Sequence, residues 1–186
     1  MTAGQTVKNT WNVLIAGFGG QGILFSGKFL VYMGLIEGKQ VSWLPSYGPE
    51  MRGGTANCSV IISDRPVGSP IVAKPDLFIV MNLPSLDRFE NDCVPDAKAV
   101  VDSSLIGRPV RRADVEAFYI PATRLADENG LTGLANMIMA GKAIRETGLC
   151  DYMNVEAAMK KTVPERKIDL FDANIKAVEI GYRYES

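Results

Sequence analysis

The sequence of 186 residues contains no histidine. The chain alone therefore supplies no Ser-His-Asp or Cys-His nucleophile pair, no histidine metal ligand, and no side chain that titrates near neutral pH without perturbation. Its three cysteines, Cys58, Cys93 and Cys150, form no Cys-x-x-Cys pair. This spacing argues against an iron–sulfur, zinc-knuckle or thioredoxin motif and is typical of buried thiols in a reducing, cytoplasmic compartment. We expect neither a catalytic residue nor a metal site in this chain.

An excess of charge of one sign is also missing. The 20 Lys and Arg residues balance 21 Asp and Glu residues, for a formal net charge of −1, which gives no indication of a nucleic-acid partner. Residues 11–36 carry a single formal charge, on Lys28. The glycines between Gly17 and Gly22 would nevertheless interrupt a membrane helix or a signal peptide. We therefore expect no membrane segment.

What the sequence does contain is enough apolar residues for one ordinary domain. It is 47% hydrophobic and 22% charged, which is typical of a globular protein. A chain of this length buries enough surface to fold without a disulfide or a structural metal. Residues 1–10 are polar and predicted to form a flexible tail, and residues 11–186 a single domain.

Hydrophobic patterns predict strands that alternate with helices. The predicted strands are Trp11–Ala16, Gln40–Leu44, Thr55–Ser63, Asp76–Met81, Ala97–Asp102 and Ala117–Ile120, and the predicted helices are Gly22–Ile36, Leu83–Asp92, Leu131–Thr147 and Val155–Lys161. This order predicts a three-layer α/β/α domain with a mostly parallel sheet. The second and third strands have no crossover helix between them, so we expect an antiparallel pair and hence a mixed sheet.

Two helix faces carry predictions about packing. Gly27, Val31 and Gly34 share one face of the first helix, where they would let its backbone approach the sheet closely. Near the C-terminus, one apolar stripe follows spacings of 3, 4, 3 and 4 and predicts a further amphipathic helix; its members are Ile168, Phe171, Ile175, Val178 and Tyr182. This stripe packs either on the body of the domain or on a partner subunit.

A glycine turn follows the first strand. Gly17-Phe18-Gly19-Gly20-Gln21-Gly22 fits the pattern G-x-G-x-x-G and opens the first helix. Glycines allow a tight turn and a close approach of backbone N–H groups to an anion, and the helix N-terminus adds partial positive charge. Lys28 lies two turns into the helix and would neutralise part of the charge of a phosphate. The pattern therefore favours a phosphate site, with a tight turn that binds no ligand as the alternative.

The residues after the second strand argue against NAD as the ligand. A dinucleotide site places an acidic residue there to bind the ribose hydroxyls, but this strand ends with Trp43-Leu44-Pro45-Ser46. Glu37 precedes the strand. The sequence still allows an NADP site in which Arg52 is the cation.

A second loop, Ser46 to Gly54 (SYGPEMRGG), follows that strand. If the first two strands are neighbours, both loops lie at one edge of the sheet, and Arg52 reaches either the same phosphate or a partner chain. Alternatively, this segment is a surface loop in which Glu50 and Arg52 pair with each other or with water.

Together, the glycine turn, Lys28 and the second loop resemble the gamma subunit of the 2-oxoacid:ferredoxin oxidoreductases, which is also the gamma domain of single-chain pyruvate:ferredoxin oxidoreductases. The resemblance extends from about Trp11 to the C-terminal helices, and Lys74-Pro75-Asp76-Leu77 also fits the family. The second loop is closer to the 2-oxoglutarate or branched-chain types than to the pyruvate type.

This resemblance implies a subunit that is inactive alone. In such a complex, thiamine diphosphate decarboxylates a 2-oxoacid, iron–sulfur clusters pass electrons to ferredoxin, and coenzyme A accepts the acyl group. Thiamine diphosphate lies between alpha and beta subunits, and the clusters belong to beta and delta subunits. The gamma subunit scaffolds the complex and helps to bind coenzyme A. That division agrees with the absence of acid–base and redox side chains, since the chemistry belongs to the cofactors.

The resemblance also implies which residues contact coenzyme A. The first group is Gly17, Gly19, Gly20, Gln21, Gly22 and Lys28. The second group is Tyr47, Arg52, Gly53 and Gly54, which could equally well lie at an interface with another subunit. Two other interpretations remain: an independent NAD(P)-dependent oxidoreductase with a Rossmann-like fold, and a scaffold module without a ligand of its own.

Overall fold

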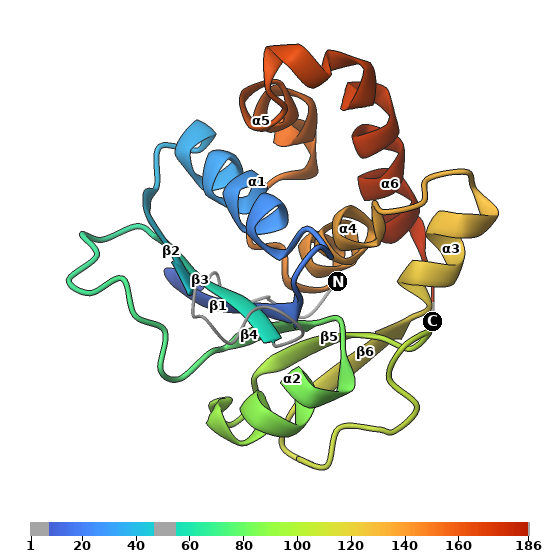
Figure 1. The fold of residues 1–186 in the computed structure, drawn as a ribbon. Coiled ribbons are helices and arrows are strands. Elements are labelled where there is room, and N and C mark those ends of the chain that lie inside the picture. Colours follow the sequence, from blue (N-terminus) through green and yellow to red (C-terminus); the bar gives the residue numbers. More distant parts are fainter. Residues whose placement is uncertain (1–7, 47–54, 186) are drawn as a thin grey trace, which may run out of the picture.

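The computed structural model describes residues 8–46 and 55–185. Six strands form one sheet in the order β2-β3-β1-β4-β5-β6 (Figure 1). They are β1 (Thr10–Phe18), β2 (Gln40–Ser46), β3 (Thr55–Ser63), β4 (Leu77–Val80), β5 (Lys98–Asp102) and β6 (Glu116–Ile120). The pairs β1–β4, β4–β5 and β5–β6 are parallel, whereas β3 pairs antiparallel with both β1 and β2. The predicted mixed sheet is confirmed.

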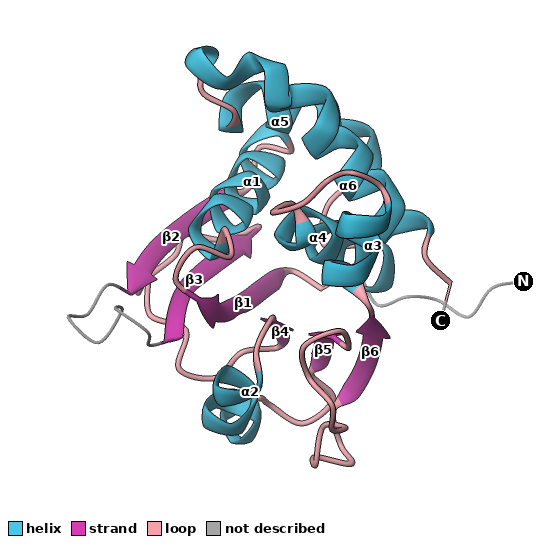
Figure 2. Cartoon of the chain, turned by 45° about the vertical axis from the view of Figure 1, so that its right-hand side comes forward, coloured by secondary structure: helices cyan, strands magenta, loops and turns pink. Residues whose placement is uncertain are grey.

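Helices cover both faces of this sheet, as predicted. One face carries α1 (Ile23–Ile36), α3 (Ala122–Glu128), α4 (Ala135–Thr147), α5 (Val155–Thr162) and α6 (Phe171–Arg183) (Figure 2). The opposite face carries α2 (Leu83–Phe89) and the connection between β5 and β6. Within the first layer, α5 packs on α1 and α6 packs on α4.

The strands divide the core by alternation. Along β1, Val13 and Ile15 belong to the core beneath α1 and α4, and Leu14 and Ala16 belong to the smaller core beneath α2. Successive side chains of a strand point to opposite faces. A strand that is buried on both faces therefore shows a continuous apolar run, which is how β1 was predicted from the sequence.

The close approach of α1 to the sheet is confirmed. A Cβ atom on Gly27 would lie 2.6 Å from Cys58 Sγ, and one on Gly34 would lie 2.9 Å from Val41 Cγ1 and Ile62 Cγ2. Both positions therefore require glycine so that the helix can sit directly on β2 and β3.

The helices differ from the prediction in two main places. The helix predicted from Leu131 begins at Ala135, because Gly133 has a φ of 88° and residues before it form a turn. The seven-residue helix α3 was not predicted. It is too short for a clear apolar period, so the sequence offered little signal for it.

The predicted C-terminal stripe is only partly right. Ile168 lies in a short 3-10 turn before α6 and is 62% exposed. The buried residues of α6 are Asn174, Ala177, Val178 and Gly181. Small residues occupy the contact because α6 crosses α4 backbone to backbone, and larger apolar residues such as Ile175 lie half-buried beside it.

Residues 8–10 of the predicted tail are bound to the domain. Lys8 Nζ lies 3.0 Å from Asp76 Oδ2, the Asn9 carbonyl accepts a bond from the N–H of Asp64, and Thr10 begins β1. Residues 1–7 lie outside the described residues.

All three cysteine thiols are free and buried, in agreement with the sequence. Burial raises the pKa of Cys58 and Cys150 to about 12 and that of Cys93 to about 11, from an ordinary value of 9.0.

Because the thiolate is the nucleophile, we expect these thiols in native protein at pH 8 to resist alkylation by iodoacetamide. Mass spectrometry of unfolded protein should show three alkylated thiols, and comparably fast labelling of native protein would contradict this burial.

Candidate functional site

The glycine turn forms an exposed corner between β1 and α1. The N–H of Gln21 donates to the Phe18 carbonyl at 3.2 Å and closes the turn. Gly20 has a φ of 94° and Gly22 a φ of 74°, in the left-handed region that favours glycine. Phe18, Gly19 and Gly20 are exposed. Their backbone is therefore open to a ligand.

Gln21 braces this turn with both polar atoms of its side chain. Its Oε1 accepts from the N–H of Phe18 at 2.5 Å, and its Nε2 donates to the Met81 carbonyl at 3.2 Å. The side chain thus ties the end of β1 to the end of β4. Gly17 leaves room for it, since a Cβ atom there would lie 2.6 Å from Gln21 Oε1. The geometry gives Gln21 and Gly17 a supporting position beneath the exposed glycines.

A pocket of about 270 Å³ opens beside the turn, at the carboxyl ends of the parallel strands. Gly20 and Gln21 follow β1, Met81 follows β4, and Leu105 follows β5. From β1 the chain crosses over one face to β2, whereas from β4 it crosses over the other face to β5. Open α/β sheets bind ligands at such a switch point.

A second pocket, of about 220 Å³, lies against Gly22 on the other side of the turn. Asn136, at the start of α4, donates from Nδ2 to the Gly22 carbonyl at 3.0 Å. A Cβ atom on Gly22 would lie 2.5 Å from this nitrogen. Glycine is thus required at position 22 for two reasons, its left-handed φ and its contact with Asn136. The sequence reasoning missed Asn136, whose only signal was an amide inside an apolar helix.

The structure does not bring Lys28 to the glycine turn. Its ammonium lies 5.8 Å from the centre of the Tyr32 ring, one helical turn farther from the turn. None of the ion pairs found within residues 8–46 and 55–185 includes Lys28. Its charge would reach a phosphate at the turn only after the side chain rotates.

The second loop is placed only through its two flanking strands. Tyr47, Arg52, Gly53 and Gly54 lie outside the described residues. β1 and β2 are not direct neighbours, because β3 lies between them. They nevertheless run in the same direction, and Phe18 pairs with Thr55 while Ser46 pairs with Asn57. Both flanking strands therefore reach the sheet edge that carries the glycine turn.

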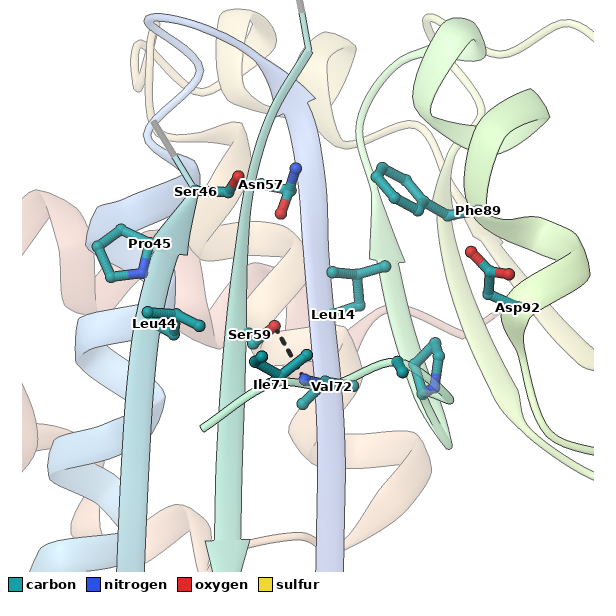
Figure 3. Close-up of a pocket in the computed structure, with 12 residues that line it drawn as sticks. Leu14, Leu44, Pro45, Ser46, Asn57, Ser59, Ile71, Val72, Phe89 and Asp92 are labelled. Carbon is teal, nitrogen blue, oxygen red and sulfur yellow. Dashed lines mark hydrogen bonds between the residues drawn. The ribbon is translucent and has the colours of Figure 1, made fainter. Parts of the chain in front are cut away.

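A groove of about 620 Å³ lies on the sheet face that carries α2 (Figure 3). On this face α2 packs against β1 and β4, and the segment around Val72 lies against β3. The Ser59 hydroxyl accepts from the N–H of Val72 at 3.4 Å. The other side chains labelled around it are Leu14, Leu44, Pro45, Ser46, Asn57, Ile71, Phe89 and Asp92.

Two further classes of site are missing from the described parts of the chain. No three His, Cys, Asp or Glu side chains there are grouped so as to hold a metal ion. Likewise, none of the helices described has the length and apolarity needed to cross a bilayer.

Comparisons with known proteins agree on one family. The family model described as pyruvate ferredoxin/flavodoxin oxidoreductase matches residues 12–184. The chain is similar to the ketoisovalerate oxidoreductase subunit VorA of Methanothermobacter thermautotrophicus, with 40% identity over 174 residues, or 91% of this chain. It spans only 35% of the length of that relative.

Two comparisons cover nearly the whole of both chains. The 2-oxoglutarate synthase subunit KorC of Methanocaldococcus jannaschii is 33% identical over 181 residues, which cover 96% of this chain and 95% of KorC. A solved structure, the gamma subunit of a keto/oxoacid ferredoxin oxidoreductase from Geobacter sulfurreducens, matches with a TM-score of 0.79 and 26% identity. It covers 92% of this chain and 96% of the gamma subunit.

Proposed function

The chain belongs to the pyruvate ferredoxin/flavodoxin oxidoreductase family, as a gamma-type subunit, and we propose that its glycine turn binds the phosphates of coenzyme A. The complete enzyme converts a 2-oxoacid to its acyl-CoA and reduces ferredoxin in the cytoplasm. Alpha, beta and delta subunits hold thiamine diphosphate and the iron–sulfur clusters. The names of VorA and KorC support a branched-chain 2-oxoacid or 2-oxoglutarate as the substrate.

The observation that carries this proposal is the open N-terminus of α1 at the switch point of the sheet. Within the part of the chain that the structure describes, no side chain caps α1, and its first turn contains no acidic residue. The first N–H groups of a helix lack intrahelical partners and carry partial positive charge. An exposed glycine corner in front of them suits a phosphate of coenzyme A.

The two alternative functions are an independent NAD(P)-dependent oxidoreductase and a scaffold without a ligand of its own. An independent NAD(P)-dependent oxidoreductase is not supported, because the family match covers residues 12–184 and β2 ends at Ser46 without an acidic residue. A scaffold without a ligand predicts a glycine turn that tolerates added charge. In our proposal the turn is assisted by Lys28, which lies on α1, and by Tyr47, Arg52, Gly53 and Gly54, which lie outside the described residues.

The test compares Gly20→Asp with Gly20→Asn in the assembled complex. Asn and Asp have nearly the same size and are among the side chains found most often at positive φ, so the φ of 94° at this position strains both variants alike. No neighbour lies within 4 Å of a Cβ atom on Gly20. The two variants therefore differ mainly in one negative charge beside the proposed phosphate.

We expect the KM for coenzyme A to be about tenfold higher for Gly20→Asp than for Gly20→Asn, since a nearby like charge weakens binding by roughly 1.4 kcal/mol. Gly68→Asp is the control, because Gly68 also has open space around it. Equal KM values for the two Gly20 variants, in complexes that assemble normally, would remove the phosphate from this turn.

A further inference from the structure

The outer edge of the sheet at β2 has no neighbouring strand among the described residues (Figure 2). β2 is the first strand in the sheet order and pairs there with β3 alone. It contains seven residues, Gln40–Ser46, and none of them is charged. Soluble proteins usually protect such an edge with charged side chains, because its N–H and C=O groups can pair with another chain. The sequence of β2 provides no such protection.

The register of the sheet shows which backbone groups of β2 point outward. The N–H of Asp64, directly after β3, donates to the carbonyl of Asn9, directly before β1. Both backbone groups of one residue point to the same neighbouring strand, and the direction alternates along the strand. Even-numbered residues of β3 therefore point toward β1, and odd-numbered ones point toward the even-numbered residues of β2. The residues of β2 that point their backbone groups outward are thus Val41, Trp43 and Pro45.

One apolar face of α1 lies beside this edge. Cβ atoms on Gly27 and Gly34 would contact residues of both β2 and β3, so α1 runs above the boundary between these two strands. The apolar residues Leu24, Val31 and Leu35 share a neighbouring face of the helix. Leu35 is 48% exposed, and the other two are half-buried. An apolar helix face beside an uncharged strand edge is typical of a surface that another protein covers.

The spacing of strands and helices favours a second copy of this chain as the occupant. If two β2 strands pair antiparallel about a two-fold axis, the two sheets become one. Because each α1 lies above the boundary between β2 and β3, the two α1 helices are then separated by two strand spacings, or about 10 Å. Packed helices lie about 8 to 10 Å apart. The same axis therefore joins the sheet edges and packs the apolar faces of the two α1 helices together.

We propose that β2 pairs antiparallel with β2 of a second copy, centred on Ser42, so that two chains share one continuous sheet. With this centre, Trp43 lies opposite Val41 of the second copy, and the outward N–H and C=O groups of both residues are paired. Pro45 has no N–H to donate and lies beyond the paired residues. The side chain of Trp43, which is 38% exposed in the single chain, packs across the axis on Val41 of the second copy.

Charge does not oppose this pairing. α1 and β2 together carry one formal charge, on Lys28. The ammonium lies 5.8 Å from the centre of the Tyr32 ring, and a lysine side chain can keep its charged end in water while its stem is covered. A surface with so little charge is compatible with its own copy, whereas it gives a strongly charged partner nothing to pair with.

Sedimentation velocity of the purified chain measures whether it forms this dimer. One strand edge and one helix face make a small interface, so we expect a dissociation constant of roughly 10 μM. The average mass should then rise from that of one chain to that of two between about 1 and about 200 μM protein, by mass action. The Gly20 variants should dimerise like wild type, because the exposed glycines of the turn are not part of the interface.

Variants of Ser42 test the register. The Ser42 side chains of the two copies are direct neighbours at the axis, where opposite residues have Cα atoms about 4.5 Å apart. Ser42→Lys and Ser42→Glu should each weaken the dimer at least about tenfold, because like charges face each other. An equimolar mixture of the two variants should dimerise about as well as wild type, since Lys then faces Glu. Ser103→Lys, at an exposed serine after β5, is the matched control and should leave the dimer unchanged.

Leu35→Lys tests the contribution of the helix separately. It places a charge on the apolar face of α1 and should weaken the dimer about threefold to tenfold. Because Leu35 is exposed in the single chain, the variant should fold normally, which circular dichroism checks. It keeps the proposal testable even where the Ser42 variants fail to fold.

Several outcomes would overturn the proposal. A wild-type chain that remains a monomer at about 200 μM does not pair through β2 with useful strength. A dimer that Ser42→Lys and Leu35→Lys leave unchanged uses another surface. A mixture of the Ser42 variants that remains monomeric excludes pairing about Ser42. If the chain is monomeric and Leu35→Lys instead blocks its assembly with the other subunits, a different subunit covers this edge.

Discussion

Replacing either Gly141 or Gly181 by alanine is expected to destabilise the protein by about 3 kcal/mol or more, the upper range for overpacking a core. A Cβ atom on Gly141 would lie 2.0 Å from the Val178 carbonyl oxygen, and one on Gly181 would lie 1.8 Å from the Ile138 carbonyl oxygen. These neighbours are backbone atoms of the facing helix. They cannot rotate away, so α4 and α6 must separate.

The expected loss of stability is larger than a stabilising effect of the same two substitutions. Alanine favours a helix over glycine by about 1 kcal/mol, which by itself would stabilise both variants. A net loss of stability would therefore come from the crossing of the two helices and not from the helix propensity of either one. The crossing also positions Asn136 and Asn174, which lie near the beginnings of the same two helices and line one pocket.

Urea denaturation followed by circular dichroism measures this effect. Gly68→Ala and Gly107→Ala are matched controls, since nothing lies within 4 Å of a Cβ atom at either position and neither has a left-handed φ. Both controls should remain within about 0.5 kcal/mol of wild type or be slightly more stable. A Gly141→Ala protein as stable as the controls would contradict the close crossing of α4 and α6.

Local signals account for the part of the fold that was predicted correctly. The strand, glycine turn and helix from β1 to α1 are contiguous in the sequence, and each has its own signature in apolar runs and glycines. The antiparallel pairing of β2 and β3 followed from their short connection. The position of the turn at a strand end likewise required no information from distant residues.

The errors arose where packing between distant elements decides the structure. The stripe from Ile168 to Tyr182 was predicted to be buried because its residues are hydrophobic. The close crossing of α6 with α4 instead requires small residues, such as Gly181, at the contact. A glycine inside a helix ordinarily weakens it, but Gly141 is the point of contact between α4 and α6. Asn136 and Asn174 went unnoticed because only the tertiary fold brings them to one pocket.

On the opposite face of the sheet, one buried carboxylate holds the connection between β5 and β6 against α2. Glu90 is 2% exposed. Its Oε1 accepts from Arg108 Nη2 at 2.7 Å, and its Oε2 accepts from Arg108 Nη1 at 3.1 Å and from the N–H of Arg111 at 3.1 Å. Arg108 also donates to Asp87. A two-pronged pair of this kind is stronger than a single charged contact.

These contacts predict how the stability of the protein depends on pH. Burial alone would raise the pKa of Glu90, but the hydrogen bonds and charges of Arg108 and Arg111 outweigh it and lower the pKa below its ordinary value of 4.5. The unfolded chain then binds a proton more readily than the folded one. The stabilisation by Glu90 is therefore complete above about pH 5 and is lost as the pH falls through the folded pKa.

We expect Glu90→Gln to lose about 2 to 3 kcal/mol of unfolding free energy at pH 7, because it leaves Arg108 without its buried countercharge. As the pH falls through the lowered pKa of Glu90, the wild-type carboxylate is itself protonated, so the difference between the two proteins should shrink. Urea denaturation at pH 7 and at a series of pH values below 4.5 measures this change. Arg108→Met, which instead leaves Glu90 uncompensated, should show the same trend with pH.

Glu156→Gln separates burial from mere ion pairing. Glu156 also has a lowered pKa, caused by the hydrogen bond and charge of Lys160, but it lies on the exposed face of α5. An exposed ion pair contributes little to stability, because water screens it and two long side chains lose freedom. We therefore expect no measurable change from Glu156→Gln at any of these pH values. A loss equal to that of Glu90→Gln would show that charge alone, without burial, determines the effect.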